Sequence, residues 1–231
     1  MVPDLEICCF NPESVIIANS LKVDRIEFCK EYNVGGLSPE ILDIEALALK
    51  CDTPVYAMLR PRKGNFVYSK AEISEMKDWI SAVQGKALTG LVTGVLNENN
   101  ELDVERLESL VKHATDLKMS FHRAFDLVKD PFKAIDILVD LEFERILTSG
   151  GRGNAYENVE KLRVMVEYAG DRIEIMPGGG VRPQNLPGLI ENTRARAFHS
   201  SAIDPTQLNK IENGDPNCDT DIIREMIRIM K

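Results

Sequence analysis

The chain has 231 residues, of which 44% are hydrophobic and 28% are charged, and its formal net charge is −9. An acidic surface repels phosphate backbones, which argues against nucleic-acid binding, and no apolar run reaches the roughly 18 residues of a membrane span. The 5 cysteines, together with an N-terminus that lacks a basic region followed by an apolar stretch, indicate reduced thiols and a cytoplasmic location.

Short runs rich in β-branched and aromatic residues alternate with amphipathic stretches along the whole chain, a pattern that predicts alternating strands and helices. The predicted strands cover residues 5–9, 24–29, 54–60, 90–96, 118–123, 144–149, 172–177 and 196–201. Helix start signals stand at Asn11-Pro12, Ser38-Pro39, Ser69 (a capping box with Glu72), Asp103 and Asp130-Pro131. Further helices are predicted at 156–168, 183–192 and 219–230.

The number and spacing of these units predict the fold. Eight strand–helix units in 231 residues give about 29 residues per unit, the size of one βα repeat. We therefore expect residues 1–231 to form one α/β domain, a single (β/α)8 TIM barrel. A doubly wound open sheet is the alternative, although it usually has about five or six strands. The irregular segment 202–218 is expected to form a loop over the barrel mouth.

Polar residues within the predicted strands fall on one parity. In the second strand, for example, Arg25, Glu27 and Cys29 alternate with Ile26 and Phe28. Because successive side chains of a strand point to opposite faces, we expect the apolar parity to face the helices and the polar parity to face the barrel axis. The helix-facing set includes Ile7, Ile26, Leu59, Phe121 and Ile175.

Four inward polar residues stand nearest the C-terminal ends of their strands: Cys8, Cys29, Arg60 and His122. Barrels of this kind carry their active sites at that end. The alternative is a buried ion network that only maintains the fold, formed by Glu6, Arg25, Glu27 and Arg60.

A glycine run closes the seventh predicted strand. Gly178, Gly179 and Gly180 leave the backbone open to close approach by a ligand, and Ser200 and Ser201 end the eighth strand. Backbone amides after strands seven and eight form the recurrent phosphate site of this fold. These residues therefore predict an anion site, and the alternative is that the glycines only make a tight turn.

Charged residues near the ends of strands three and five suggest acid–base chemistry. We expect Glu27, Arg60 and His122 to form one polar cluster of candidate catalytic residues. His122 would act as general acid or base, with Glu27 or Asp126 as its orienting carboxylate, and Arg60 with Arg62 would bind a carboxylate or phosphate. The alternatives are a structural core histidine and salt bridges across the mouth.

Two thiols end neighbouring strands. Cys8 and Cys29 are each preceded by Glu-x, and adjacent parallel strands lie about 4.8 Å apart, so both sulfurs are placed to share one soft ion. Two thiolates favour Cu(I). Cys9 is expected to point toward the helices, and Cys218 lies in a distal segment. The alternative, two ordinary buried cysteines, is the commoner explanation when these residues are taken alone.

The motifs LEICC, DRIEFC, GGLSP, LRPRKGNFVYS, FHRAFD, RILTSG, MPGGGV and FHSSA stand in this order between residue 5 and about residue 202. In this order they resemble the CutC copper homeostasis family. The resemblance implies a (β/α)8 fold, a cytoplasmic homo-oligomer and Cu(I) binding, and it places the copper thiols at Cys8 and Cys29. The chain departs from the family at Lys22-Val23 and at 151–158.

Two functional hypotheses result. The first is a cytosolic copper homeostasis protein that binds Cu(I) through Cys8 and Cys29. The second is a TIM-barrel enzyme that acts on a small phosphorylated or carboxylated metabolite at the same mouth, using the glycine run, Arg60 and His122. In both cases the partner is a copper ion or a small anionic ligand.

Overall fold

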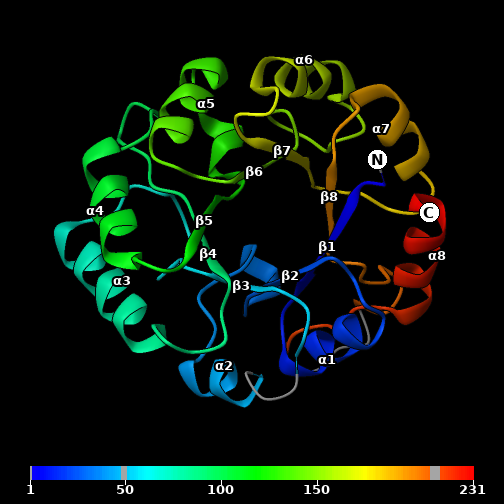
Figure 1. Ribbon diagram of the computed structural model, residues 1–231, viewed down its shortest axis with the longest axis horizontal. Coiled ribbons are helices and arrows are strands. Elements are labelled where there is room, and N and C mark those ends of the chain that lie inside the picture. The colour runs from blue at the N-terminus through cyan, green and yellow to red at the C-terminus, as the bar shows by residue number, and fades with distance from the viewer. Residues whose placement is uncertain (1, 48–50, 209–213) are drawn as a thin grey trace.

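The computed structural model describes residues 2–47, 51–208 and 214–231, and within them eight strands alternate with eight helices around one axis (Figure 1). The strands are β1 (Asp4–Cys9), β2 (Arg25–Phe28), β3 (Val55–Met58), β4 (Gly90–Thr93), β5 (Lys118–Phe121), β6 (Arg145–Thr148), β7 (Glu174–Pro177) and β8 (Ala197–Ser200). The helices are α1 (Pro12–Ser20), α2 (Ile41–Leu47), α3 (Lys70–Val83), α4 (Val104–Ala114), α5 (Pro131–Asp140), α6 (Val159–Ala169), α7 (Leu186–Thr193) and α8 (Thr220–Met230). Two short 3-10 helices, η1 (Tyr32–Val34) and η2 (Arg123–Leu127), follow β2 and β5.

The strands form a parallel barrel. Hydrogen-bonded neighbours run in the order β7-β6-β5-β4-β3-β2-β1-β8, and β7 lies beside β8, so the barrel is nearly closed. The helices form the outer ring in Figure 1. The predicted (β/α)8 barrel is therefore confirmed, and the open doubly wound sheet is excluded.

Four helices begin at the predicted caps. The Asn11 side chain accepts a hydrogen bond from Ser14 N, and Ser69 forms the capping box with Glu72. Asp103 and Asp130 cap α4 and α5 in the same way. Such caps satisfy backbone amides that have no partner inside the helix.

The expected start of the second helix is wrong. Helix α2 begins at Ile41, because Ser38 is used elsewhere. Its hydroxyl accepts a hydrogen bond from Arg60 N at 2.9 Å, and its own amide donates to the Arg60 carbonyl at 3.0 Å. Ser38 therefore ties the chain after β2 to the end of β3 instead of capping a helix.

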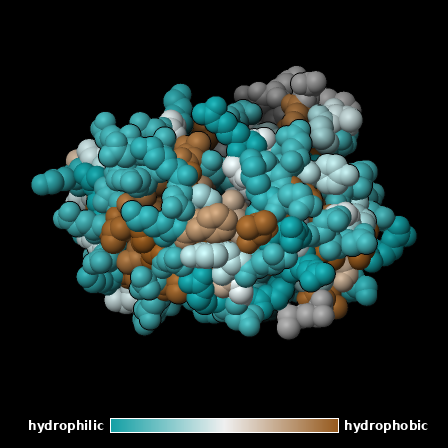
Figure 2. All heavy atoms as spheres, turned by 90° about the horizontal axis from the view of Figure 1, so that it is seen from above, coloured by the Kyte–Doolittle hydropathy of each residue, from teal (hydrophilic) through white to brown (hydrophobic). Residues whose placement is uncertain are grey.

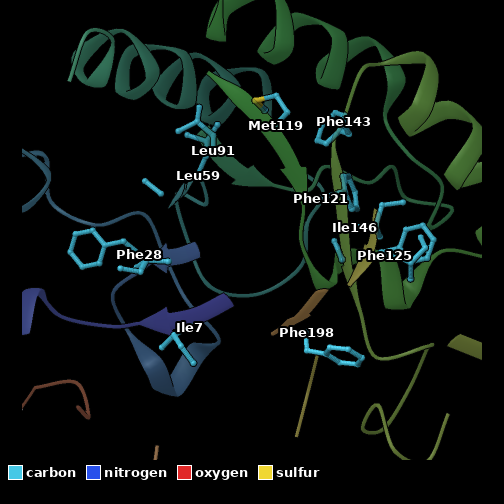
Figure 3. Packing of buried hydrophobic residues seen from close by; sticks show 14 of the residues in the cluster. Ile7, Phe28, Leu59, Leu91, Met119, Phe121, Phe125, Phe143, Ile146 and Phe198 are labelled. Atoms are coloured by element: carbon cyan, nitrogen blue, oxygen red, sulfur yellow. The ribbon is translucent and has the colours of Figure 1, made fainter. Parts of the chain in front are cut away.

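The apolar parity of the strands faces the helices, as predicted. Ile7, Ile26, Leu59, Phe121 and Ile175 are all at most 2% exposed and belong to one cluster with the inner faces of the helices. Figure 3 shows part of this cluster, with Met119 on the helix side of its strand. A separate inner cluster contains Cys8, Cys29, Tyr56, Met58 and Val92. The pleat thus sorts apolar residues outward and leaves the barrel axis to polar and sulfur-containing side chains.

The outer surface is mainly hydrophilic, with scattered apolar patches, in the view of Figure 2. None of the helices within the described ranges is both long enough and apolar enough to cross a bilayer. Residues 209–213 of the expected mouth loop lie outside the described residues. In the described part of that loop, the Asp215 carboxylate accepts hydrogen bonds from Glu31 N and Tyr32 N at 2.8 and 2.7 Å, so the loop contacts the segment after β2.

Candidate metal and anion site at the barrel mouth

A buried ion network occupies the barrel axis below the mouth. Glu6 is fully buried, with one carboxylate oxygen 2.5 Å from Arg25 Nε and the other 2.6 Å from His199 Nδ1. Arg25 also pairs with Glu144 at 2.6 Å. Burial alone would raise the pKa of Glu6, but Arg25 and His199 reverse this effect and lower the pKa to about 2. Burial would lower the pKa of His199, but its hydrogen bond to Glu6 raises it. Glu6 is therefore held as a carboxylate.

This network corrects the structural alternative drawn from the sequence. It contains Glu6 and Arg25, as proposed there, but neither Glu27 nor Arg60 pairs within it. Glu27 contacts thiols instead, and Arg60 binds backbone carbonyls.

The two predicted thiols face each other. Cys8 Sγ lies 3.7 Å from Cys29 Sγ, and Glu27 Oε1 lies 3.2 Å from the first sulfur and 3.4 Å from the second. The strand register produces this contact, because Cys8 on β1 stands beside Glu27 on β2 and Cys29 follows the end of β2. Three buried donor groups therefore meet at one point of the mouth.

His199 extends this group and was missed as a site residue. One ligand atom each from Cys8, Glu27 and His199 lies within 4.8 Å of the others. The alternation along β8 was a usable signal, because Phe198 packs in the outer cluster and His199 is therefore expected to point inward. The sequence analysis used this segment only for the anion site at Ser200 and Ser201.

Cys8 and Cys29 are held in their protonated thiol form. Burial raises the pKa of Cys8 well above its usual value and that of Cys29 to about 12. Burial also raises the pKa of Glu27. A soft metal must therefore displace protons when it binds, which makes its affinity depend on pH.

The sulfur spacing fits a bent metal site. Two metal–sulfur bonds of about 2.3 Å, the length found for zinc, would need sulfurs about 4.6 Å apart for linear coordination. The observed separation of 3.7 Å is shorter and leaves one side open to a third donor. Glu27 contacts both sulfurs, and His199 lies within 4.8 Å of Cys8 and Glu27, so a third donor is available for a three-coordinate Cu(I) ion.

The remaining thiols lie elsewhere, as predicted for Cys9 and Cys218. Cys9 belongs to the outer cluster, and Cys218 packs in that same cluster with its sulfur 3.5 Å from the Ser14 carbonyl. Cys9 is thus a matched control for Cys8, since both are buried and adjacent in sequence.

The guanidinium groups of Arg60 and Arg62 donate hydrogen bonds to backbone carbonyls of the neighbouring loops. The Arg60 guanidinium donates to the carbonyls of Val34 and Gly36 at 2.9 and 3.0 Å, and no carboxylate pairs with it within the described ranges. Arg62 pairs with Glu72 and donates to the Val67 carbonyl at 2.8 Å. Of these two arginines, only Arg60 lines the central cavity.

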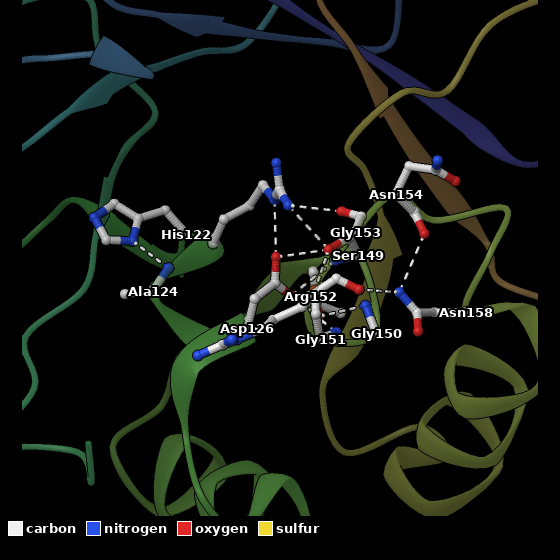
Figure 4. Close-up of polar contacts among 12 residues, drawn as sticks. His122, Ala124, Asp126, Ser149, Gly150, Gly151, Arg152, Gly153, Asn154 and Asn158 are labelled. Atoms are coloured by element: carbon white, nitrogen blue, oxygen red, sulfur yellow. Dashed lines mark hydrogen bonds and ion pairs between the residues drawn. The ribbon is translucent and has the colours of Figure 1, made fainter. Parts of the chain in front are cut away.

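His122 has a different partner from the one expected. Its Nδ1 accepts a hydrogen bond from Ala124 N at 3.1 Å, and burial together with Arg60 lowers its pKa to about 3 (Figure 4). The imidazole is therefore neutral, and its proton is on Nε2. The expected orienting carboxylate is wrong, because Glu27 contacts thiols and Asp126 accepts from Thr148 Oγ1 at 2.6 Å. Glu27, Arg60 and His122 line one cavity without pairing with one another.

The glycine run is only partly available to a ligand. Gly178 N donates to the Thr148 carbonyl at 2.9 Å, so its expected role as an anion donor is wrong. The Ser200 hydroxyl donates to the Val181 carbonyl at 2.8 Å. Gly179, Gly180 and Ser201 do line the cavity, and so does Arg182, which the sequence analysis did not identify.

One cavity of about 260 Å³ lies at the C-terminal ends of the strands, and Cys8, but not Cys29, lines it. Its polar lining includes Cys8, Glu27, Arg60, His122, Arg123, Arg182, His199, Ser200 and Ser201. The cavity joins a thiol–carboxylate–imidazole group to a set of arginines and glycine backbone.

Comparison with known proteins finds related sequences and structures for this chain. The model of the CutC family matches residues 4–204. A CutC family protein from Glaesserella parasuis is 40% identical over 86% of this chain and 82% of that protein, and the human copper homeostasis protein cutC homolog is 39% identical over 86% and 72%. The crystal structure of CutC from Streptococcus agalactiae superposes with a TM-score of 0.82 at 34% identity, covering 86% of this chain and 98% of that one.

More distant structures share the fold alone. Phosphoribosyl anthranilate isomerase from Thermococcus kodakaraensis has a TM-score of 0.63 at 14% identity, over 100% of this chain and 99% of that one. The family match, by contrast, is a match of sequence, and its range of residues 4–204 includes both Cys8 and Cys29. The chain therefore belongs to the CutC family.

Proposed function

We propose that this chain is a cytoplasmic copper homeostasis protein that binds Cu(I) through the thiolates of Cys8 and Cys29. The observation that carries the proposal is the 3.7 Å contact between two buried sulfurs at the cavity. Thiolates are the ligands that Cu(I) prefers, and two or three of them suffice for its linear or trigonal coordination. The human relative is named for copper homeostasis, which supports the same cargo.

The third ligand comes from Glu27 or His199, which share the site with Cys8. Both thiols lose their protons to solvent when the metal binds, because each ligates copper as a thiolate. The resulting copper dithiolate carries a negative charge, and His199 ligates it only as the neutral imidazole. As part of the same proposal, the protein works as a homo-oligomer.

The proposal is tested by Cu(I) titration against a competing chromophoric chelator, under anaerobic and reducing conditions. Cys8→Ser and Cys29→Ser are each expected to weaken binding by tenfold or more, which is about 1.4 kcal/mol. Cys9→Ser removes a thiol that faces the helices and is expected to bind as the wild type does. Equal affinity in all four proteins would refute the thiol site.

A further inference from the structure

The cavity holds more space than a metal ion needs. Its volume is about 260 Å³, whereas a single water needs only about 10–15 Å³ on a comparable measure. The thiols lie at one part of its wall, where Cys8 lines the cavity. The rest of the wall is built for a different kind of ligand.

Two guanidinium groups face this space without a carboxylate partner among the described residues. Arg60 is 6% exposed and donates to backbone carbonyls. Arg182 donates to the Val181 carbonyl at 2.9 Å and to Ser200 Oγ at 3.1 Å. Buried charges are normally paired, so the buried Arg60 and the partly buried Arg182, neither with a carboxylate partner among the described residues, indicate a missing anion.

Neutral donors stand beside these charges. The amides of Gly179 and Gly180 line the cavity and have no acceptor within the described ranges. His122 Nε2 is buried with no hydrogen-bond partner among the described residues, and it carries the proton because Nδ1 accepts from Ala124. A buried donor without an acceptor destabilises the protein, and a bound acceptor would remove that cost.

We propose that the mouth binds a small phosphate monoester, with its phosphate at Arg182 and the Gly179–Gly180 backbone and its remainder directed toward His122 and Arg60. Two unpaired cations match a phosphate monoester, which carries a charge of about −1.5 to −2 at pH 7, better than a single carboxylate. The position after strands seven and eight is the one where barrels of this fold bind phosphate. This site goes beyond copper binding and does not depend on it.

Calorimetric titration of the metal-free, reduced protein tests the proposal, with inorganic phosphate and glycerol 3-phosphate as probes and chloride as the ionic-strength control. We expect saturable binding of both probes, with the ester at least threefold tighter. Arg182→Met is expected to weaken both by at least tenfold. Arg224→Gln removes an exposed guanidinium from α8 and is expected to stay within twofold of the wild type.

His122→Asn tests the other end of the ligand. Asparagine can still accept from Ala124 N, but it lacks the Nε2 donor, so the ester should lose its advantage over inorganic phosphate. If Arg182→Met does not fold, Arg182→Gln, which still offers donors to Val181 and Ser200, takes its place. The proposal is overturned if no binding saturates, if the arginine variant binds as Arg224→Gln does, or if the ester is no tighter than phosphate in the wild type.

Discussion

Replacement of Glu6 by glutamine removes the carboxylate that joins Arg25 to His199 in the axial network. Glu6 is fully buried and contacts Arg25 at 2.5 Å and His199 at 2.6 Å, so the change leaves two cationic side chains with a weaker partner. Breaking a buried pair by removing one partner typically costs about 3–5 kcal/mol. We expect a loss in that range, because among the described residues Arg25 keeps Glu144, whereas His199 keeps no carboxylate within ion-pair distance.

Urea unfolding followed by circular dichroism measures this free energy, and the midpoint should fall without a change in slope. Glu160→Gln is the matched control, since it makes the same chemical change in an exposed pair with Arg163 and should cost at most about 1 kcal/mol. The pKa of His199, followed by NMR, should also fall in Glu6→Gln because Glu6 raises it. A cost no larger than the control, or an unchanged His199 pKa, would refute this account of the network.

Three further predictions follow from the same structure. The pKa of His122 is about 3 in the folded chain, below its ordinary value of 6.5. The stability that neutral His122 contributes is therefore fully present above pH 6.5 and is lost as the pH falls toward 3. The stability advantage of wild type over His122→Asn should therefore shrink by about 1.4 kcal/mol between about pH 7.5 and pH 5.5, measured by urea unfolding. Cu(I) binding should release about two protons near neutral pH, because burial raises the pKa of both thiols, and titration in buffers of different ionisation enthalpy would count them. Ser69→Ala should lower stability by about 1 kcal/mol through loss of the α3 cap, whereas Ser74→Ala, within that helix, should change it little.

The sequence was sufficient for the barrel and for the thiol pair because both depend on strand periodicity. A residue's parity in a strand decides which face it occupies, so Ile7 and Cys8 are sorted without knowledge of any loop. The same rule applied to β8 would have found His199.

The loops were the part that periodicity could not predict. Whether Arg60 binds a carboxylate or the Gly36 carbonyl depends on how the chain turns after β2. Likewise, the Gly178 amide is not available to a ligand because it donates to the carbonyl of Thr148 on β6. Arg182 stands two residues beyond the glycine run, and only the folded turn brings it to Ser200. Contacts of this kind depend on loop conformation, which varies far more than strand geometry.

The environment of bound copper tests the central claim most directly. X-ray absorption spectroscopy of the protein loaded with one equivalent of Cu(I) should show two sulfur neighbours and one nitrogen or oxygen neighbour, because Glu27 contacts the sulfurs of Cys8 and Cys29 and His199 lies within 4.8 Å of Cys8 and Glu27. The spectrum should be unchanged in Cys9→Ser and should lose one sulfur in Cys8→Ser. A copper ion without sulfur neighbours, or a spectrum indifferent to Cys8, would contradict the thiol site.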